Sequence, residues 1–470
     1  MKLKKFMSIV TAIALTGGCM AGCSTQTVAT VPAETGKETA AVTNAETAAE
    51  TNAETAGNED QLSIPDTPIT IEYWDHITEN PEKGIIEAAI GRFEKAYPNV
   101  KVNVTHTQND SYKEKLVVAM SSGQCPDMYS HWGGGPMNEY IESGYAQDIT
   151  DLYKQYCKIP FLQAAVEQSS YNGKLYAIPF RSINGSGFFY NKDIFAKNNI
   201  EIPQTIDELE ADCDKLKEAG YIPLALANAN KWTGSMYYMY LVARKSGLKE
   251  FNAAVDGTGS FTSEAFKYAG EKIQDWVKKG YFPEGVNSLN ADDGQDKQLI
   301  YTEQAAMMLE GSWMTADMPS DDKDFYSSKI GFFPFPKNSE SDADQSIMVG
   351  TSIGNGYSFN CKEDKLKACF ILATQFINDQ EYIDALTAAG KIPPIKGVET
   401  KITDPVVKQV WEAFSKASAV QLWYDQYLPP MVAEKHKDTC QEIFGLTMTP
   451  DQADQELETA MKTYIDSKKK

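Results

Sequence analysis

The pattern of hydrophobic and polar positions predicts alternating strands and helices over the first part of the folded region. Residues 69–74 and 100–105 alternate apolar with polar side chains and are rich in β-branched and aromatic residues, as strands are. Between them, residues 84–97 place apolar side chains at every third or fourth position, the spacing of an amphipathic helix. Residues 112–122 predict a second helix, and residues 127–130 a short third strand. This alternation predicts a mainly parallel sheet with helices on both faces.

The same alternation continues through the rest of the chain. Thr205, with Glu208 three positions later, forms a capping-box pattern at a helix start, and Gly220 is placed to end that helix. Further strands are predicted at 187–190, 304–309 and 331–335, and further helices at 366–377 and 450–465. The predicted fold class is therefore α/β. A folded part of about 400 residues exceeds the size at which one hydrophobic core stops growing, so we expect two lobes.

The N-terminal residues follow a different pattern, that of an export signal. Three lysines precede the apolar run 6–15, and small residues then lead to Cys23. The run is shorter than the roughly 20 residues that span a bilayer. Met20-Ala21-Gly22-Cys23 resembles a bacterial lipobox, which implies a signal peptide over 1–22 and lipidation of Cys23. An ordinary cleaved signal with a chance cysteine is the alternative.

Residues 23–67 are expected to form a disordered acidic linker. The sequence Asn-Ala-Glu-Thr-Ala occurs at 44–48 and again at 52–56, and the segment contains no aromatic residue. It cannot bury enough apolar surface to offset the entropy of ordering it. The linker would therefore tether the folded part to the lipidated end.

Net charge and cysteine spacing make some classes of binding partner less favourable. The formal net charge is −21, which disfavours nucleic acid and anionic lipid. No Cys-x-x-Cys pair is present, which weakens the case for structural zinc. An exported protein can be oxidised, so the cysteines of the folded part could form disulfides or remain free thiols. These are Cys125, Cys157, Cys213, Cys361, Cys369 and Cys440.

No motif for catalysis or for a cofactor stands out. The four histidines lack the spacing of a metal site on one helix face, and the sequence contains no P-loop, Gly-x-Gly-x-x-Gly or Gly-x-Ser-x-Gly motif. We interpret Asp292-Asp293 and Asp321-Asp322 as solvated loop residues. We therefore expect no cofactor, no metal and no catalytic residue.

Five tryptophans stand beside polar residues close to where predicted strands end. In open α/β sheets, ligands bind beyond the carboxyl ends of the strands. An indole ring can cover the apolar C–H face of a sugar while neighbouring polar groups bond its hydroxyls. Core packing is the alternative for each ring alone, but five rings in similar positions favour a shared cleft. The set is Trp74 with Asp75, Trp132, Trp232, Trp313, and Trp423 with Tyr424.

The order of several short segments resembles one family, the extracellular sugar-binding proteins of ABC importers that are similar to maltose-binding protein. The matching segments are 121–127 (Ser-Ser-Gly-Gln-Cys-Pro-Asp), 172–179, 189–195 with 203–209, 303–313 (ending Gly-Ser-Trp) and 376–394. The sequence departs from the family pattern at Cys125 and at the glycine-rich stretch 133–135.

The resemblance implies a two-lobe periplasmic-binding-protein-like fold of type II with a hinge between the lobes. The N-terminal lobe would hold 68–179 and 348–397, and the C-terminal lobe 180–347 and 398–470. The crossings are expected near Pro179, Met348 and Val398.

The resemblance also implies a binding protein rather than an enzyme. Its partners would be a carbohydrate ligand, the transmembrane subunits of an ABC permease, and the membrane through a lipid anchor. It would act as a monomer on the extracytoplasmic face of a bacterial membrane. The candidate ligand-binding residues are Trp74, Asp75, Trp132, Arg181, Asn184, Trp232, Trp313, Trp423 and Tyr424. The strand-to-helix turn at Asn191, Lys192 and Asp193 is expected to be structural.

Two other functions stay open at this point. A receptor of the same fold could take a polyamine, a metal or a peptide, and Asp75 in the cleft would suit a cation. A surface glycoside hydrolase would need two carboxylates about 5–10 Å apart. Asp75 with Glu310 is the pair that the sequence offers.

Overall fold

The computed structural model of the chain describes residues 62–469. The signal peptide, Cys23 and the linker as far as residue 61 lie outside the described residues. The predicted linker boundary at residue 67 is too late, because Leu62 is buried in the core of the first lobe.

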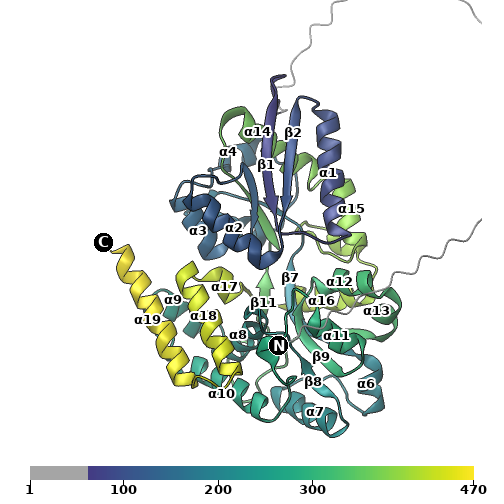
Figure 1. The fold of residues 1–470 in the computed structure, drawn as a ribbon. Coiled ribbons are helices and arrows are strands. Elements are labelled where there is room, and N and C mark those ends of the chain that lie inside the picture. The colour runs from purple at the N-terminus through teal and green to yellow at the C-terminus, as the bar shows by residue number, and fades with distance from the viewer. Residues whose placement is uncertain (1–61, 470) are drawn as a thin grey trace, which may run out of the picture. The chain divides into compact units, whose positions relative to one another are not determined.

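The first lobe is built on a five-stranded sheet in the order β2-β1-β3-β12-β6 (Figure 1). Strands β1, β2 and β3 are parallel, whereas β12 runs antiparallel to both β3 and β6. The strands are β1 (Ile69–Asp75), β2 (Val100–His106), β3 (Met128–His131), β6 (Ile178–Phe180) and β12 (Asn355–Phe359).

Helices cover both faces of this sheet, as expected. Because side chains alternate along a strand, Met128 packs into the core beneath α1, whereas Tyr129 packs with Leu116 of α2. The helices of this lobe are α1 (Glu82–Ala96), α2 (Asn109–Ser121), α3 (Gly134–Glu142), α4 (Thr150–Tyr156), α5 (Gln163–Gln168), α14 (Glu363–Ile371) and α15 (Gln380–Ala388).

The second lobe contains a mixed six-stranded sheet. Its main path is β13-β11-β7-β9-β8, and β10 pairs with β7. Strand β7 is antiparallel to β9, β10 and β11, so the expected mainly parallel sheet is wrong here. Neighbouring strands are parallel when a crossover helix joins them. Strand β7 enters from the other lobe and β11 leads back to it without such a helix, so they need not be parallel to their neighbours. The strands are β7 (Asn184–Asn191), β8 (Ile222–Ala225), β9 (Ala305–Gly311), β10 (Ile330–Phe333), β11 (Met348–Thr351) and β13 (Val420–Gln421).

Side-chain caps fix several helix starts in this lobe. Asn191 accepts hydrogen bonds from the amides of Asp193 (2.9 Å) and Ile194 (3.1 Å), which confirms the structural role expected for this turn. Thr205 accepts from the Glu208 amide (3.2 Å), but the Glu208 carboxylate accepts from the Gln204 amide rather than completing the box. The helices are α6 (Lys192–Lys197), α7 (Ile206–Glu218), α8 (Trp232–Ser246), α9 (Lys249–Val255), α10 (Glu264–Lys278), α11 (Gln295–Tyr301), α12 (Met314–Asp321), α13 (Lys323–Lys329), α16 (Pro405–Lys416), α17 (Tyr424–Tyr427), α18 (Pro430–Phe444) and α19 (Pro450–Lys468).

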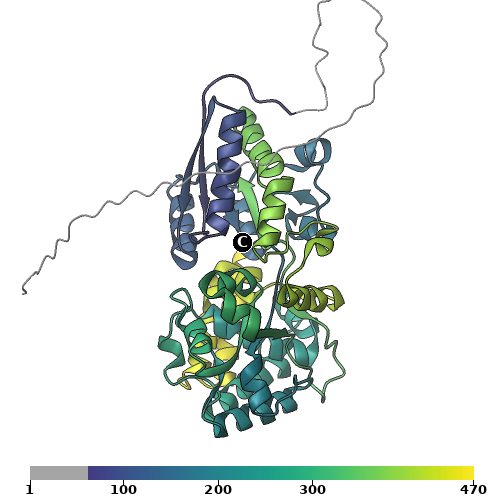
Figure 2. The ribbon, with the colours of Figure 1, turned by 90° about the vertical axis from the view of Figure 1, so that its right-hand side faces the viewer.

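The chain crosses between the lobes three times, and Figures 1 and 2 show these segments joining the two sheets. The first crossing lies between β6 and β7. The second follows Thr351, because β11 pairs with β7 in the second sheet, so the boundary predicted at residue 348 is a few residues early. The third crossing begins before the predicted position at Val398, because Ile392 already packs in a core cluster of the second lobe. A side chain at Gly354 would meet the Ser182 carbonyl at 1.8 Å, so the first two crossings touch through their backbones.

Candidate ligand-binding cleft

A cavity of about 260 Å³ lies between the lobes and is lined by residues of both. Loops after β1 and β2 line it from the first lobe. The end of β9, the start of α12 and the segment before α17 line it from the second. These are mostly the carboxyl ends of strands, where α/β sheets place their ligands.

Four of the predicted tryptophans line this cavity. Trp132 comes from the first lobe, with its ring tilted against His76 at a centroid distance of 4.5 Å. Trp232, Trp313 and Trp423 come from the second lobe and touch one another. The ring centroids of Trp232 and Trp313 lie 5.7 Å apart, and those of Trp313 and Trp423 lie 5.8 Å apart. The second lobe therefore presents a continuous aromatic wall.

Trp74 and Asp75 do not line the cavity, which corrects their predicted role. The Asp75 side chain is 0% exposed, and Tyr73, His106 and the Ile77 amide bond its carboxylate. All of its bonding capacity is used inside the lobe. The Trp74 ring packs near α2 instead, with the Lys115 ammonium 4.2 Å from its centroid.

Asn184 and Tyr424 are also buried away from the cavity. The Asn184 amide oxygen accepts from the Ser312 hydroxyl (3.1 Å), which ties β7 to the loop that carries Trp313. The Tyr424 ring stacks on Phe251 with centroids 3.9 Å apart, in the core of the second lobe. Tyr424 lies between the cavity residues Trp423 and Asp425 in the sequence, but its own side chain points into the core.

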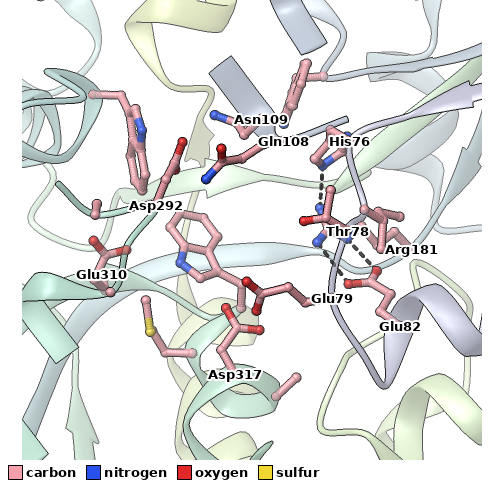
Figure 3. Close-up of a pocket in the computed structure, with 18 of the residues that line it drawn as sticks. His76, Thr78, Glu79, Glu82, Gln108, Asn109, Arg181, Asp292, Glu310 and Asp317 are labelled. Carbon is pink, nitrogen blue, oxygen red and sulfur yellow. Dashed lines mark hydrogen bonds and ion pairs between the residues drawn. The ribbon is translucent and has the colours of Figure 1, made fainter. Parts of the chain in front are cut away.

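Arg181 lines the cavity as predicted, and it does so within a network on the first crossing (Figure 3). Its guanidinium donates to both carboxylate oxygens of Glu82, and the distance from Nη2 to Oε2 is 2.9 Å. It also donates to His76 Nε2 at 2.8 Å. It also donates to the Asn355 amide oxygen at 3.2 Å, and Asn355 lies at the second crossing. Its backbone has a φ of 72°, which is rare for a residue with a side chain.

The third crossing reaches the same carboxylate. The Lys391 ammonium, 2% exposed, lies 3.7 Å from Glu82 Oε2 and 3.7 Å from Asp317 Oδ1 of α12. Burial opposes the ionisation of Glu82, but the charges of Arg181 and Lys391 outweigh it and hold its pKa below the ordinary value. Burial and the nearby Arg181 lower the pKa of His76 well below 6.5, so His76 is neutral.

Three carboxylates on the second lobe were not predicted as ligand-binding residues, although Glu310 was considered as half of a catalytic pair. Glu310 at the end of β9 and Asp296 in α11 are 1% and 2% exposed, and Asp292 lies in the preceding loop. Burial raises the pKa of Glu310, with repulsion from Asp296 adding to it, and burial raises the pKa of Asp296. Burial raises the pKa of Asp292 to about 6. Asp292 is a partly buried turn residue that lines the cavity, which corrects its interpretation as a residue of a solvated loop.

These raised pKa values predict how stability depends on pH. A carboxyl whose pKa is raised on folding stabilises fully below its unfolded value and loses that contribution as pH rises through the folded value. The charged groups that face this pair are Asp317 near Glu310 and Lys297 near Asp296. Glu310→Gln is expected to gain stability relative to wild type as pH increases from 5 to 8. Melting temperatures of both ligand-free proteins across this range test it, and a difference that stays constant with pH would contradict it.

Several of the missed residues follow the rule that identified the tryptophans. Gln108 and Asn109 come directly after β2, and Glu79 lies in the loop after β1. Glu310 belongs to the same strand end as Trp313. Applying the strand-end rule to polar residues as well as to aromatics would have found them.

The two lobes also touch each other through residues that do not line the cavity. Asn230 of the second lobe donates to Asp110 of α2 at 3.1 Å, and Lys468 of α19 pairs with Glu142 of α3 at 2.6 Å. The start of α3 packs directly on α17: a Cβ on Gly135 would lie 2.3 Å from the Leu428 carbonyl oxygen. The glycine-rich stretch that departs from the family pattern is therefore where the lobes meet backbone to backbone.

Within residues 62–469, no cluster of three or more His, Cys, Asp or Glu side chains is arranged to hold a metal ion. Over the same residues, no helix has the length and apolar character needed to cross a bilayer. The six cysteines of the folded part are free thiols in the structure.

The fold and the cleft together define a two-lobe solute-binding protein. The chain belongs to the bacterial extracellular solute-binding protein family, whose model matches residues 78–391. The expected α/β two-lobe fold of the periplasmic-binding-protein type is thereby confirmed, as is the predicted family.

Several known proteins are similar to this chain in sequence or in structure. An uncharacterised ABC transporter extracellular-binding protein of Pyrococcus horikoshii is 28% identical over 250 residues, 52% of this chain and 55% of that protein. The multiple sugar-binding protein of Streptococcus mutans is 25% identical over 290 residues, 57% of this chain and 62% of that protein. The match thus spans little more than half the length of these relatives. A structure from a study of xylan utilisation by the thermophile Caldanaerobius polysaccharolyticus is 27% identical, with a TM-score of 0.77, covering 83% of this chain and 99% of that one.

Proposed function

We propose that this protein captures a carbohydrate in the cavity between its lobes and delivers it to the permease of an ABC importer. The observation that carries the proposal is the aromatic wall of Trp232, Trp313 and Trp423, with Trp132 on the other lobe. Indole faces suit the apolar faces of sugar rings, and the surrounding carboxylates and amides suit their hydroxyls. The sugar-related relatives support the same ligand class.

The three crossings would serve as the hinge on which the lobes close over the ligand, a common motion of binding proteins. The permease would recognise the closed form. Lipidation of Cys23 would hold the protein at the extracytoplasmic face of the membrane. Incorporation of a fatty-acid analogue into the wild type but not into Cys23→Ser would test this anchor.

The carboxylate pair that a glycosidase would need is not formed in the cavity. Glu310 lines the cavity, but Asp75 is buried outside it with every oxygen bonded within its own lobe. A binding function without chemistry is the proposal that agrees with both the family and the site.

Binding is tested by melting the folded part against a panel of mono- and oligosaccharides. A ligand at 100 times its dissociation constant should stabilise the protein by about 2.7 kcal/mol, which gives a clear rise in melting temperature. No rise with any sugar, from a folded sample, would reject the proposal.

Trp313→Ala should weaken the binding of a sugar found in this way by at least about tenfold, because aromatic anchors dominate binding energy. Calorimetric titration measures the change. Trp411→Ala is the matched control: Trp411 belongs to α16, packs on the core of the second lobe and does not line the cavity, so affinity should stay the same. Wild-type affinity in Trp313→Ala would show that the sugar binds elsewhere.

A further inference from the structure

The two walls of the cavity differ in how their charges are compensated. Each cationic side chain that lines it already has a carboxylate partner: Arg181 with Glu82, Lys391 with Glu82 and Asp317, Lys113 with Asp425, and Lys297 with Asp321. Among the described residues, no cation pairs with Asp292, Asp296 or Glu310. Figure 3 shows Glu310 and Asp292 on the far side of the cavity from Arg181. The excess negative charge is thus concentrated on the second lobe.

Burial makes this arrangement costly for the empty protein. Glu310 and Asp296 are almost completely shielded from water, and an ionised carboxylate in such a place is destabilised unless it is paired with a cation. For Glu310 the structure supplies a hydrogen bond from the Gly311 amide at 3.2 Å. A cation entering the cavity would remove this penalty.

The tryptophans of the two lobes also differ in whether a cation lies over the ring. On the first lobe, the Lys113 ammonium lies 4.9 Å from the centroid of Trp132. Over the described residues, no lysine or arginine lies over Trp232, Trp313 or Trp423. Three indole rings next to three carboxylates that have no ion-pair partner form the setting in which ammonium groups are bound.

A second group on this wall lacks a partner. The Trp423 side chain is 8% exposed, lines the cavity, and its Nε1 donor makes no hydrogen bond. A buried N–H without a partner costs free energy comparable to a lost hydrogen bond. The wall therefore lacks both an acceptor for this indole and a cation for the carboxylates.

We infer that the ligand is a cationic saccharide, an amino sugar whose ammonium group lies against Glu310 and Asp296. This inference rests on the proposed function and narrows its ligand class. The sugar ring packs on the tryptophans, and the ammonium compensates the two buried carboxylates. A neutral sugar would pack on the tryptophans equally well but would leave the two carboxylates uncompensated.

The experiment compares saccharides that differ only in the amine. Calorimetric titrations would use the β-1,4-linked glucosamine disaccharide and cellobiose, with glucosamine, galactosamine and mannosamine against glucose, galactose and mannose. Spermidine is included as a cation without a sugar ring. At least one amino sugar is expected to bind about tenfold or more tightly than its neutral counterpart, since a charged hydrogen bond replaces a neutral one.

Glu310→Gln keeps the shape of the side chain and removes its charge, so it should reduce the preference for the amine to a few-fold or less. Glu412→Gln, an exposed carboxylate on α16, is the matched control and should keep the full preference. Melting curves of both variants establish that they are folded.

The outcomes separate the inference from the proposed function. Binding of neutral sugars as tight as that of their amino counterparts would overturn the inference and leave a carbohydrate receptor. Binding of spermidine alone, or of nothing in this set, would overturn the inference, and the proposed function would fall only if the wider panel of mono- and oligosaccharides also gave no binding. A preference for the amine that survives in Glu310→Gln would overturn the assignment of the ammonium to this carboxylate.

Discussion

Replacing Glu82 with glutamine is expected to lower the free energy of unfolding by about 3–5 kcal/mol, the usual cost of removing one partner from a buried ion pair. The Glu82 carboxylate receives Arg181 from the first crossing and Lys391 from the third. It also begins α1, where the helix dipole favours a negative charge. The amide would leave Arg181 without a counter-ion in a largely buried place.

Urea denaturation followed by circular dichroism measures this change. Glu87→Gln is the matched control on the same helix, because Glu87 is half exposed and its ion pairs are 3.7 Å or longer. The control should lose no more than about 1 kcal/mol, as exposed pairs do. If the two variants unfolded at the same urea concentration, the central role of Glu82 would be refuted.

Replacing Gly135 with alanine is expected to weaken ligand binding by about 100-fold, by lowering the population of the state in which the lobes meet. Its Cβ would lie 2.3 Å from the Leu428 carbonyl oxygen across the lobe boundary. The φ of Gly135 is not positive, so alanine strains no backbone within the first lobe. The lobes would have to stay apart at α3 and α17.

Small-angle scattering of the variant with ligand should show a larger radius of gyration than the wild type with ligand. Gly91→Ala is the control, because a Cβ there meets no atom within 4 Å. Wild-type affinity and scattering in Gly135→Ala would show that the contact between α3 and α17 is not needed for binding.

Periodicity in the sequence was enough to predict the first three strands and the first two helices of the first lobe. The helix expected at 84–97 is α1 (Glu82–Ala96), and the strand expected at 100–105 is β2 (Val100–His106). Strand direction in the second lobe was not predictable in this way. Whether β7 runs with or against β9 depends on where the chain enters the lobe, and local alternation carries no such information.

The cleft was predicted less completely than the fold. Aromatic residues at strand ends pointed to Trp132, Trp232, Trp313 and Trp423, which all line the cavity. The same rule failed for Trp74 and Asp75, because side chains alternate along β1 between the α2 side and the core of the lobe, and neither of these two enters the cavity. Glu310 was missed as a binding residue because a carboxylate at the end of a buried strand is recognised only once its surroundings are known.

The convergence of the three crossings on Glu82 has an evolutionary consequence. Arg181, Asn355 and Lys391 belong to three segments far apart in the sequence, yet all act around one carboxylate. Recombination that exchanged one lobe between relatives would bring together a carboxylate and cations of different ancestry. These four positions should therefore be inherited together, and a viable chimera would need to take all of them from one parent.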